Sequence, residues 1–521
     1  MALHSYNQNS PDPSRRKILK GGITTLLAAP LVASAKTSTA MSADSRHSSS
    51  SAPVTFAPSS EKRADISSLF ETIKRQASPE QLYKFLYLMP KGGDIHHHLG
   101  GGFLPSMWYR IATDPQRNGG QRFYTRYRIS TMKMHPILNS RGKSYIYQWQ
   151  TLNEKTYNSL SAEFKTDFML LSDLNNQQRL AWMSSVVLDK KGEGRDEFFE
   201  YTWSRLGDLL SSIHVLTELF VENMKLFSAE GVRYMEIQRR LHSYKDEHGE
   251  LIPAQQSDKY WKWRLAQKDA KNTGVEVRWQ GVALRFASDA EQQIRDYYKH
   301  IDANRDVWVG INMAGREDDN RGYPARFKDV FDEMLRKYPG IGISIHAGEA
   351  EKPDNYIRDT LRLGATRIGH GINLLSDEDT LLRMRDSKFL VEINLISNEL
   401  LEYVPNLDLH PFPIYLRQGI ACCLNTDDRG MWDSNFTDEV FVAVQRFNLS
   451  WAEIQKTAYN SYDFSFAEES LKRELVYGFK KDLELFENQF SESNWEAILA
   501  EVPAVTHGYG RSVLKLKLQP Y

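Results

Sequence analysis

Residues 341–349 read IGISIHAGE, an apolar, β-rich run that ends in a histidine and a carboxylate. An amphipathic helical pattern over 324–338 precedes this run, and another strand-like run over 367–372 follows it. Alternating strand and helix signals are typical of a parallel sheet, because each crossover between parallel strands needs a helix-sized connection. This part of the chain therefore predicts an α/β fold built on a parallel sheet.

The same pattern extends along the chain in both directions. Eight apolar, β-rich runs occur, at residues 94–99, 232–237, 275–284, 307–313, 341–346, 367–372, 389–396 and 421–424. From the second run onward, helical stretches separate most of them, which predicts a closed, TIM-type (β/α)8 barrel. A doubly wound open sheet is the alternative. It is disfavoured because no run is followed by the Gly-x-Gly-x-x-Gly pattern of a dinucleotide site.

A long insertion is expected after the first strand. Well over a hundred residues separate the first two runs, far more than a normal connection needs. We place the insertion at about residues 103–215. Its first half is aromatic and irregular, and its second half, from about residue 161, has helical patterns. The prediction is a mainly helical insertion.

Composition excludes several classes of protein. The chain has 521 residues, of which 41% are hydrophobic, so it can bury a large core. Lys and Arg number 66 against 67 Asp and Glu, which leaves no basic excess for binding nucleic acid. No apolar run approaches 18 residues, so stable membrane insertion is not expected. The two cysteines, Cys422 and Cys423, are neighbours that cannot readily pair with each other.

The first 63 residues have the pattern of a targeting signal followed by a linker. Arg15 and Arg16 precede a weakly apolar stretch that ends in Ala33-Ser34-Ala35, the order of a secretory signal, and the paired arginines resemble a twin-arginine signal. A short amphipathic helix with two surface arginines is the alternative. We expect a signal peptide over 1–35, a Ser-rich linker over 36–63 and the barrel domain over 64–521. Cleavage near Ala35 would deliver the protein to the periplasm or the medium.

Polar residues gather where the predicted strands end, which is the end that carries the chemistry in such barrels. The ends carry His96 and His98, His346 and Glu349, His370 between two glycines, and Asp427 and Asp428. Alone, each has an ordinary explanation, such as a structural histidine, a solvated carboxylate or a helix cap. Together they place three imidazoles and a carboxylate on one rim, a donor set that suits zinc.

The ordered motifs carry a resemblance to a known family. They are MPKGGDIHHH at 89–98, MAG at 313–315, HAGE at 346–349, GHG at 369–371 and NTDD at 425–428. In this order they resemble the adenosine/AMP deaminase family, and within it the adenosine deaminase-related growth factors and their secreted bacterial relatives. The resemblance runs from about Leu86 to the C-terminal helices and implies a (β/α)8 fold.

The resemblance also implies an activity and a role for each motif residue. The activity would be zinc-dependent hydrolytic deamination of adenosine, and of 2′-deoxyadenosine, with release of ammonia. One Zn²⁺ per chain would be held by His96, His98, His346 and Asp427. Asp427 would also be a catalytic residue. Glu349 would protonate N1 of the purine, and His370 would orient and deprotonate the attacking water. Asp428 would bond N7, and the Gly315 backbone would meet N3.

The sequence departs from the family pattern at the sugar end. Gly100 stands where relatives often carry an acid that meets the ribose, so we assign sugar recognition to the insertion, acting as a lid. Arg429 stands where many relatives have proline, and the insertion lacks the cysteines of the growth-factor branch. Arg316 and Arg429 follow two of the motifs and offer candidate phosphate contacts.

Other functions stay open at this point. A deaminase of AMP or another aminopurine uses the same chemistry. Another metal-dependent barrel hydrolase is disfavoured because no strand ends in a lysine that could bridge two metals. A non-catalytic exported binding protein is disfavoured because Glu349 and His370 are both present. The expected partner is a small purine nucleoside, and the sequence does not determine the oligomeric state.

Overall fold

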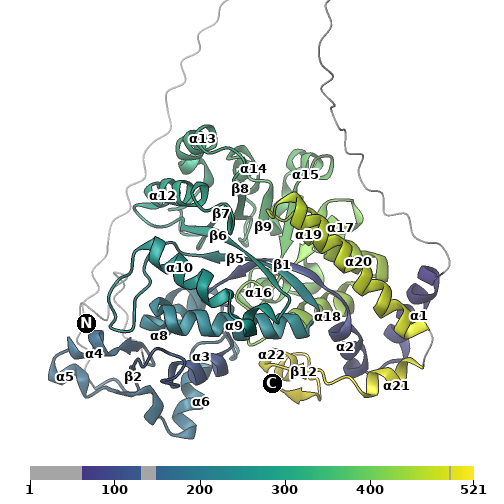
Figure 1. Cartoon of the computed structure of the whole chain (residues 1–521). Helices are drawn as coiled ribbons and strands as arrows, with labels where there is room; N and C mark the ends of the chain where they lie inside the picture. Colours follow the sequence, from purple (N-terminus) through teal and green to yellow (C-terminus); the bar gives the residue numbers. More distant parts are fainter. Residues whose placement is uncertain (1–61, 131–147, 492–493) are drawn as a thin grey trace, which may run out of the picture. The chain divides into compact units, whose positions relative to one another are not determined.

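The computed structural model describes residues 62–130, 148–491 and 494–521. The predicted signal over 1–35 lies outside these residues, as does nearly all of the linker. Eight parallel strands form the central sheet (Figure 1). They are β1 (Gly92–His98), β5 (Val232–Arg239), β6 (Glu276–Leu284), β7 (Trp308–Ala314), β8 (Gly342–Ala347), β9 (Arg367–His370), β10 (Leu390–Ile393) and β11 (Ala421–Leu424). Every predicted strand is confirmed.

The sheet closes into a barrel at its two edge strands. The strands follow one another from β1 and β5 through to β11, and His97 pairs in parallel with Asp427, just beyond the end of β11. The Asp427 N–H donates to the His96 carbonyl at 3.0 Å, and the His98 N–H donates to the Asp427 carbonyl at 3.2 Å. The predicted (β/α)8 barrel is therefore confirmed, and its closure places Asp427 beside the β1 histidines.

Helices surround the barrel and cover the outward faces of its strands (Figure 1). The main ones are α9 (Ile213–Ala229), α10 (Ala254–Leu265), α12 (Ala290–Asp302), α13 (Lys328–Lys337), α14 (Tyr356–Arg362), α15 (Glu378–Arg385), α17 (Phe412–Arg417), α18 (Phe436–Phe447) and α19 (Trp451–Asp463). They form because apolar residues recur at helical spacing, as in α12, where Ile294, Tyr298 and Ile301 are buried. A capping box at Ser450 fixes the start of α19.

Further helices and two short strands lie at the two ends of the described chain. Helices α1 (Lys62–Gln76) and α2 (Pro79–Leu88) precede the first strand. Helices α20 (Glu469–Ser491), α21 (Trp495–Ala500) and α22 (Gly508–Ser512) follow α19, with the short strands β12 (Val505–Thr506) and β13 (Gln519–Pro520).

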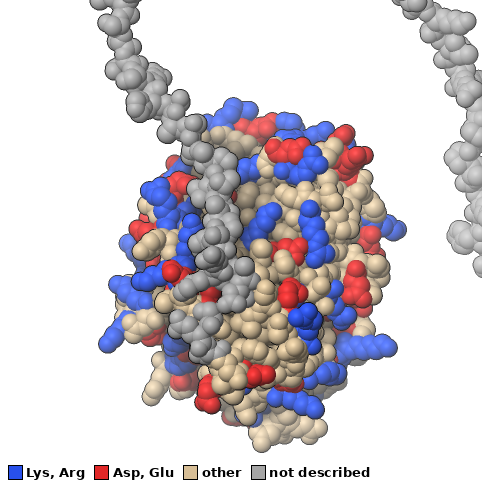
Figure 2. Space-filling view, turned by 90° about the vertical axis from the view of Figure 1, so that its right-hand side faces the viewer, with Lys and Arg blue, Asp and Glu red and all other residues tan. Residues whose placement is uncertain are grey.

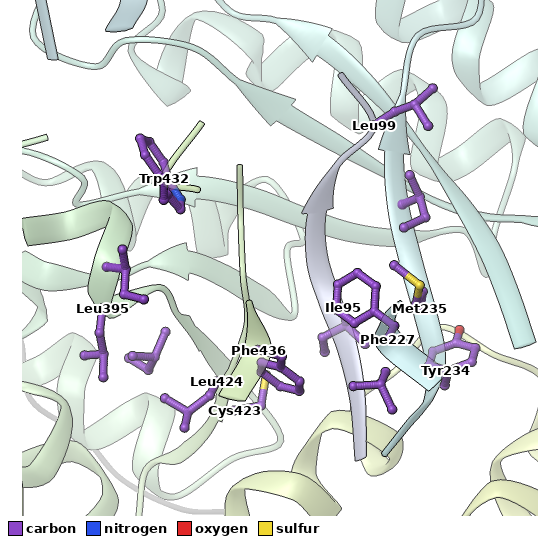
Figure 3. Packing of buried hydrophobic residues seen from close by; sticks show 14 of the residues in the cluster. Ile95, Leu99, Phe227, Tyr234, Met235, Leu395, Cys423, Leu424, Trp432 and Phe436 are labelled. Carbon is purple, nitrogen blue, oxygen red and sulfur yellow. The ribbon is translucent and has the colours of Figure 1, made fainter. Parts of the chain in front are cut away.

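The packing of β1 decides which way its histidines face. Ile95 of β1, Met235 of β5 and Phe227 of α9 are fully buried and lie close together (Figure 3). Burying one such side chain contributes roughly 1.5–3 kcal/mol. Because side chains alternate across a strand, burying Ile95 against the helices turns His96 and His98 toward the barrel interior.

The insertion after β1 combines helices with a small sheet that the sequence did not reveal. Strands β2 (Phe123–Arg126), β3 (Thr151–Asn153) and β4 (Phe168–Leu170) form an antiparallel sheet in the order β3-β2-β4. The helices are α3 (Pro105–Ala112), α4 (Glu154–Asn158), α5 (Ala162–Lys165), α6 (Asn176–Ser184), α7 (Arg195–Glu197) and α8 (Trp203–Leu206). Strands of three or four residues are too short for a recognisable alternation, so only the helical second half was foreseen.

The surface agrees with the balanced composition. On the face drawn in Figure 2, Lys and Arg side chains are interspersed with Asp and Glu. Among the described residues, no helix is both long enough and apolar enough to span a bilayer.

Candidate active site

Four predicted ligands converge at the carboxyl ends of the strands. One nitrogen each from His96, His98 and His346 and one oxygen from Asp427 all lie within 4.8 Å of one another. His346 Nε2 is 3.1 Å from His96 Nε2 and 3.2 Å from His98 Nε2, and His98 Nε2 is 3.1 Å from Asp427 Oδ1. Tetrahedral zinc bonds of about 2.0–2.1 Å place neighbouring ligand atoms about 3.4 Å apart. The donor set therefore fits one such ion.

Buried partners orient two of these rings. The His96 Nδ1–H faces Glu392 Oε2 at 2.6 Å, and the His346 Nδ1–H faces Asn312 Oδ1 at 2.9 Å. Both rings then carry their proton on Nδ1, so their Nε2 lone pairs face each other, an arrangement that a cation between them stabilises. Sequence reasoning did not single out Glu392 or Asn312. For Glu392 the sequence did offer a signal, because a carboxylate inside a buried strand run needs a polar partner.

Glu349 follows the end of β8, where its surroundings favour the protonated carboxyl. Its side chain is 4% exposed, and burial raises its pKa well above the ordinary value, with the Asp427 and Glu317 carboxylates adding to the shift. Glu317 accepts the N–H groups of Gly348 at 3.0 Å and of Glu349 at 3.3 Å, which fixes the turn. A neutral carboxyl held rigidly at the end of a strand can donate a proton to a bound base.

His370 lies at the end of β9 with its ring in the same site. Its Nε2 is 3.6 Å from Glu349 Oε1, and burial lowers its pKa to about 3, so the ring is neutral. Its φ of +65° is unusual for a residue other than glycine. Gly369, which precedes His370, lies against the His96 ring. A Cβ there would lie 2.7 Å from His96 Cε1, so the glycine makes room for the ring of a candidate metal ligand.

Asp428 and Gly315 complete the predicted set. Asp428 is buried, its Oδ1 has no hydrogen-bond partner among the described residues, and burial together with Asp427 raises its pKa well above the ordinary value. Gly315 has a φ of +108°, a conformation that only glycine adopts readily. Both line one cavity with His98, His346, Glu349, His370 and Asp427. The structure thus brings the predicted site residues together, with His96 beside the cavity.

The cavity extends from the candidate metal ligands toward the insertion. Its volume is about 580 Å³, within the usual range of small-molecule sites. The insertion contributes Phe198, Phe199, Glu200, Trp203 and Leu210 to its wall. From β5 comes Gln238, whose side chain is buried and whose two amide atoms have no partner among the described residues.

The two arginines named as candidate phosphate contacts differ in their position relative to the cavity. Arg429 does not line the cavity, because its buried guanidinium pairs with Glu230 at 3.0 Å and lies over the Phe227 ring. Arg429 is therefore not available as a phosphate contact in this cavity. Arg316 does line the cavity, but it is paired with Asp196 at 2.6 Å and Asp318 at 2.5 Å.

The fold and the site together define a class. A closed parallel barrel with three imidazoles and a carboxylate gathered at its strand ends is a metal-binding (β/α)8 barrel of the type found in metal-dependent hydrolases. A family model described as Adenosine deaminase matches residues 178–481, more than half of the chain. The chain belongs to the adenosine deaminase family. The match includes His346, Glu349, His370 and the Asp427–Asp428 pair, whereas the β1 histidines lie outside it.

Curated relatives agree over part of their length. The chain is 30% identical over 208 residues to an adenosine deaminase of Vibrio cholerae, which is 40% of this chain and 60% of that protein. It is 32% identical over 208 residues to an adenosine deaminase of Pectobacterium atrosepticum, covering 40% and 59%. The chain thus aligns with about three fifths of the length of these relatives.

Solved structures share the fold. An adenine deaminase from Arthrobacter aurescens aligns with a TM-score of 0.53 at 19% identity, over 76% of this chain and 99% of that chain. ADAL of Arabidopsis, solved with GMP, gives 0.54 at 18% identity, over 76% and 98%. A Burkholderia ambifaria amidohydrolase with bound Zn gives 0.56 at 16% identity, over 79% and 95%.

Proposed function

We propose that the protein is a zinc-dependent aminohydrolase that converts adenosine and 2′-deoxyadenosine to inosine and 2′-deoxyinosine, with release of ammonia. The proton-holding Glu349 beside the three-histidine, one-aspartate donor set is the observation that carries the proposal. Membership of the adenosine deaminase family supports it.

The residues suggest how the reaction proceeds. His96, His98, His346 and Asp427 would hold one Zn²⁺. When bound, zinc lowers the pKa of a coordinated water to about 7 and so supplies a nucleophile at neutral pH. As water adds to C6, Glu349 gives its proton to N1, which prevents negative charge from accumulating on the ring. The Glu349 carboxylate would next take the proton of the new C6 hydroxyl and pass it to the amino group, so that the C6–N bond breaks, ammonia leaves and C6 becomes a carbonyl. Glu349 would regain its proton from the next water as that water becomes hydroxide.

Two further groups would orient the base. Burial and the neighbouring Asp427 raise the pKa of Asp428, which favours a protonated carboxyl that would donate to N7, an atom that only accepts hydrogen bonds. The Gly315 backbone would meet N3 across the cavity. At the sugar end, the contribution of Phe198 and Trp203 to the cavity wall supports our assignment of the insertion as a lid.

AMP is the second candidate substrate, and one observation favours it. Arg240 lines the cavity and forms no ion pair with any described residue. The ion pairs of Arg316 argue the other way, because they already neutralise its charge.

We expect kcat/KM to be higher for adenosine and 2′-deoxyadenosine than for AMP and free adenine. The reason is that the cavity extends past the base site but, among the described residues, offers a phosphate only one uncommitted arginine. Comparing the four compounds by the ultraviolet change on deamination measures this directly. A clear preference for AMP would overturn the nucleoside assignment and leave the deamination chemistry standing.

We also propose that the protein is exported, on the basis of Arg15, Arg16 and the small-residue site ending at Ala35. In a host with a twin-arginine pathway, changing both arginines to lysine should leave folded, active precursor in the cytoplasm. Fractionation followed by an activity assay measures the distribution. Unchanged delivery across the membrane would contradict the assigned route.

A further inference from the structure

A buried chain of hydrogen bonds leads from a backbone amide to the ring of His370. The Phe412 N–H is 3.1 Å from His410 Nδ1, and His410 Nε2 is 3.1 Å from Asn398 Oδ1. Asn398 Nδ2 is in turn 2.9 Å from His370 Nδ1. His370, Asn398, His410 and Phe412 are each 2% exposed or less.

The first donor fixes the direction of every later bond. A backbone N–H can only donate, so His410 Nδ1 accepts and the proton of that ring lies on Nε2. This Nε2–H requires an acceptor, which determines that the oxygen of the Asn398 amide faces His410. The nitrogen of the same amide then faces His370 and donates to its Nδ1.

The proton of the His370 ring is thereby placed. Nδ1 accepts a hydrogen bond and carries no proton, and an imidazole in a protein keeps at least one. The proton therefore lies on Nε2. Asn394 Nδ2 lies 3.3 Å from the same Nδ1 and 3.4 Å from the Glu392 carbonyl oxygen, so it offers this nitrogen a second N–H and no competing acceptor.

The other side of the ring faces the reaction site. His370 Nε2 is buried without a hydrogen-bond partner among the described residues, and it lies 3.6 Å from Glu349 Oε1. Asn398 is itself held rigidly, because it lies on α16 (Leu395–Leu400). Its backbone carbonyl accepts the Tyr403 N–H at 3.1 Å. The hydrogen-bond chain thus points a donor, in a fixed orientation, into the cavity.

We infer that Asn398 and His410 are positioning residues that hold His370 in its Nε2–H tautomer, so that His370 donates a hydrogen bond to the oxygen of the attacking water. The inference rests on the proposed deamination for the identity of that oxygen. It changes the role that the resemblance implies for His370. A nitrogen that already carries a proton cannot take one from water, so His370 orients the nucleophile and stabilises its oxygen as charge develops.

Histidine-labelled protein tests the tautomer without reference to activity. Two-bond ¹H–¹⁵N correlation spectra distinguish protonated from unprotonated ring nitrogens, and His370→Gln identifies the His370 signals by their loss. We expect the wild-type spectrum to show Nε2–H and unprotonated Nδ1. A wild-type spectrum with Nδ1–H would overturn the inference, whatever the substrate proves to be.

Asn398→Asp reverses the hydrogen bond at almost constant size. A carboxylate only accepts, so it should draw the His370 proton to Nδ1 and leave Nε2 without one. We expect kcat for adenosine to fall by at least ~10-fold, KM to change little, and metal content and Tm to stay near the wild-type values. His410→Gln should retain most of the activity, because its amide can still donate to Asn398 Oδ1.

Asn406→Asp is the matched control. Asn406 is exposed, and its Oδ1 accepts the Asp408 N–H at 3.0 Å, a bond that aspartate preserves. The Asn406→Asp variant adds the same negative charge in the neighbouring segment and should leave kcat unchanged. If Asn398→Asp shows Nδ1–H but keeps wild-type kcat, the donor role of His370 is refuted. If wild-type enzyme deaminates no aminopurine, the proposed function fails, while the wild-type spectrum still decides the tautomer.

Discussion

Replacing Glu349 with glutamine is expected to lower kcat by roughly 100-fold or more while metal content stays at the wild-type level. Burial and the neighbouring carboxylates keep a proton on Glu349, which makes it the donor for N1. Glutamine preserves size and hydrogen bonding but cannot release a proton and recover it in each cycle. Turnover of adenosine by ultraviolet absorbance and zinc by elemental analysis are the two measurements.

Glu351→Gln is the matched control for this experiment. Glu351 lies two residues further along the chain, its side chain is 57% exposed, and it pairs with Arg195 at 2.8 Å. The control removes a carboxylate from the same loop without touching the site, so kcat should remain close to wild type. Near-normal turnover by Glu349→Gln would contradict the proton-donor role, and loss of zinc from that variant would show that Glu349 supports the metal site instead.

The barrel and its site residues could be predicted because both depend on local sequence. Each strand is a short apolar run, and each motif lies within a few residues of the end of a run, as in 341–349. Parallel strands present their carboxyl ends at one rim, so topology alone brings His98, His346 and Asp427 together. This prediction needs no distance between the strands, only their order and direction.

The supporting contacts could not be predicted, because they join distant parts of the chain. Glu392 meets His96 across 296 residues of sequence, and Asn398 meets His370 from the helix that follows the next strand. Periodicity gives the face on which a side chain lies but not its partner across the barrel. For the same reason Arg429 read as a candidate ligand contact, although it turns away to pair with Glu230.

The β1 histidines show how fold and site depend on each other. They can serve as metal ligands because Ile95 is buried on the outer face of the strand, which turns the alternate residues inward. Gly369 then leaves the space that the His96 ring occupies. A bulkier residue at position 369 would displace the His96 ring without altering any residue of the predicted site.

Asp427→Ala is expected to weaken metal binding by more than ~100-fold while the barrel stays folded. Deamination activity should fall in proportion to the zinc that is lost. Changing a partner of a metal ligand already costs about 10–100-fold in affinity, so removing a ligand should cost more. The barrel closure at position 427 uses backbone N–H and carbonyl groups, which alanine retains. Zinc content and activity report the loss, and circular dichroism reports the fold.

Two companion variants make that result interpretable. Position 427 has a φ of +53°, a conformation that Asp and Asn tolerate better than Ala, so Asp427→Asn separates loss of the charge from backbone strain. It should lose zinc and activity as the alanine variant does, with a Tm close to that of zinc-stripped wild type. Asp386→Ala, at a site where the side chain is 61% exposed, should keep both zinc and activity. A fully active, zinc-free Asp427→Ala protein would refute the ligand assignment, because catalysis would then not depend on the zinc that Asp427 is assigned to hold.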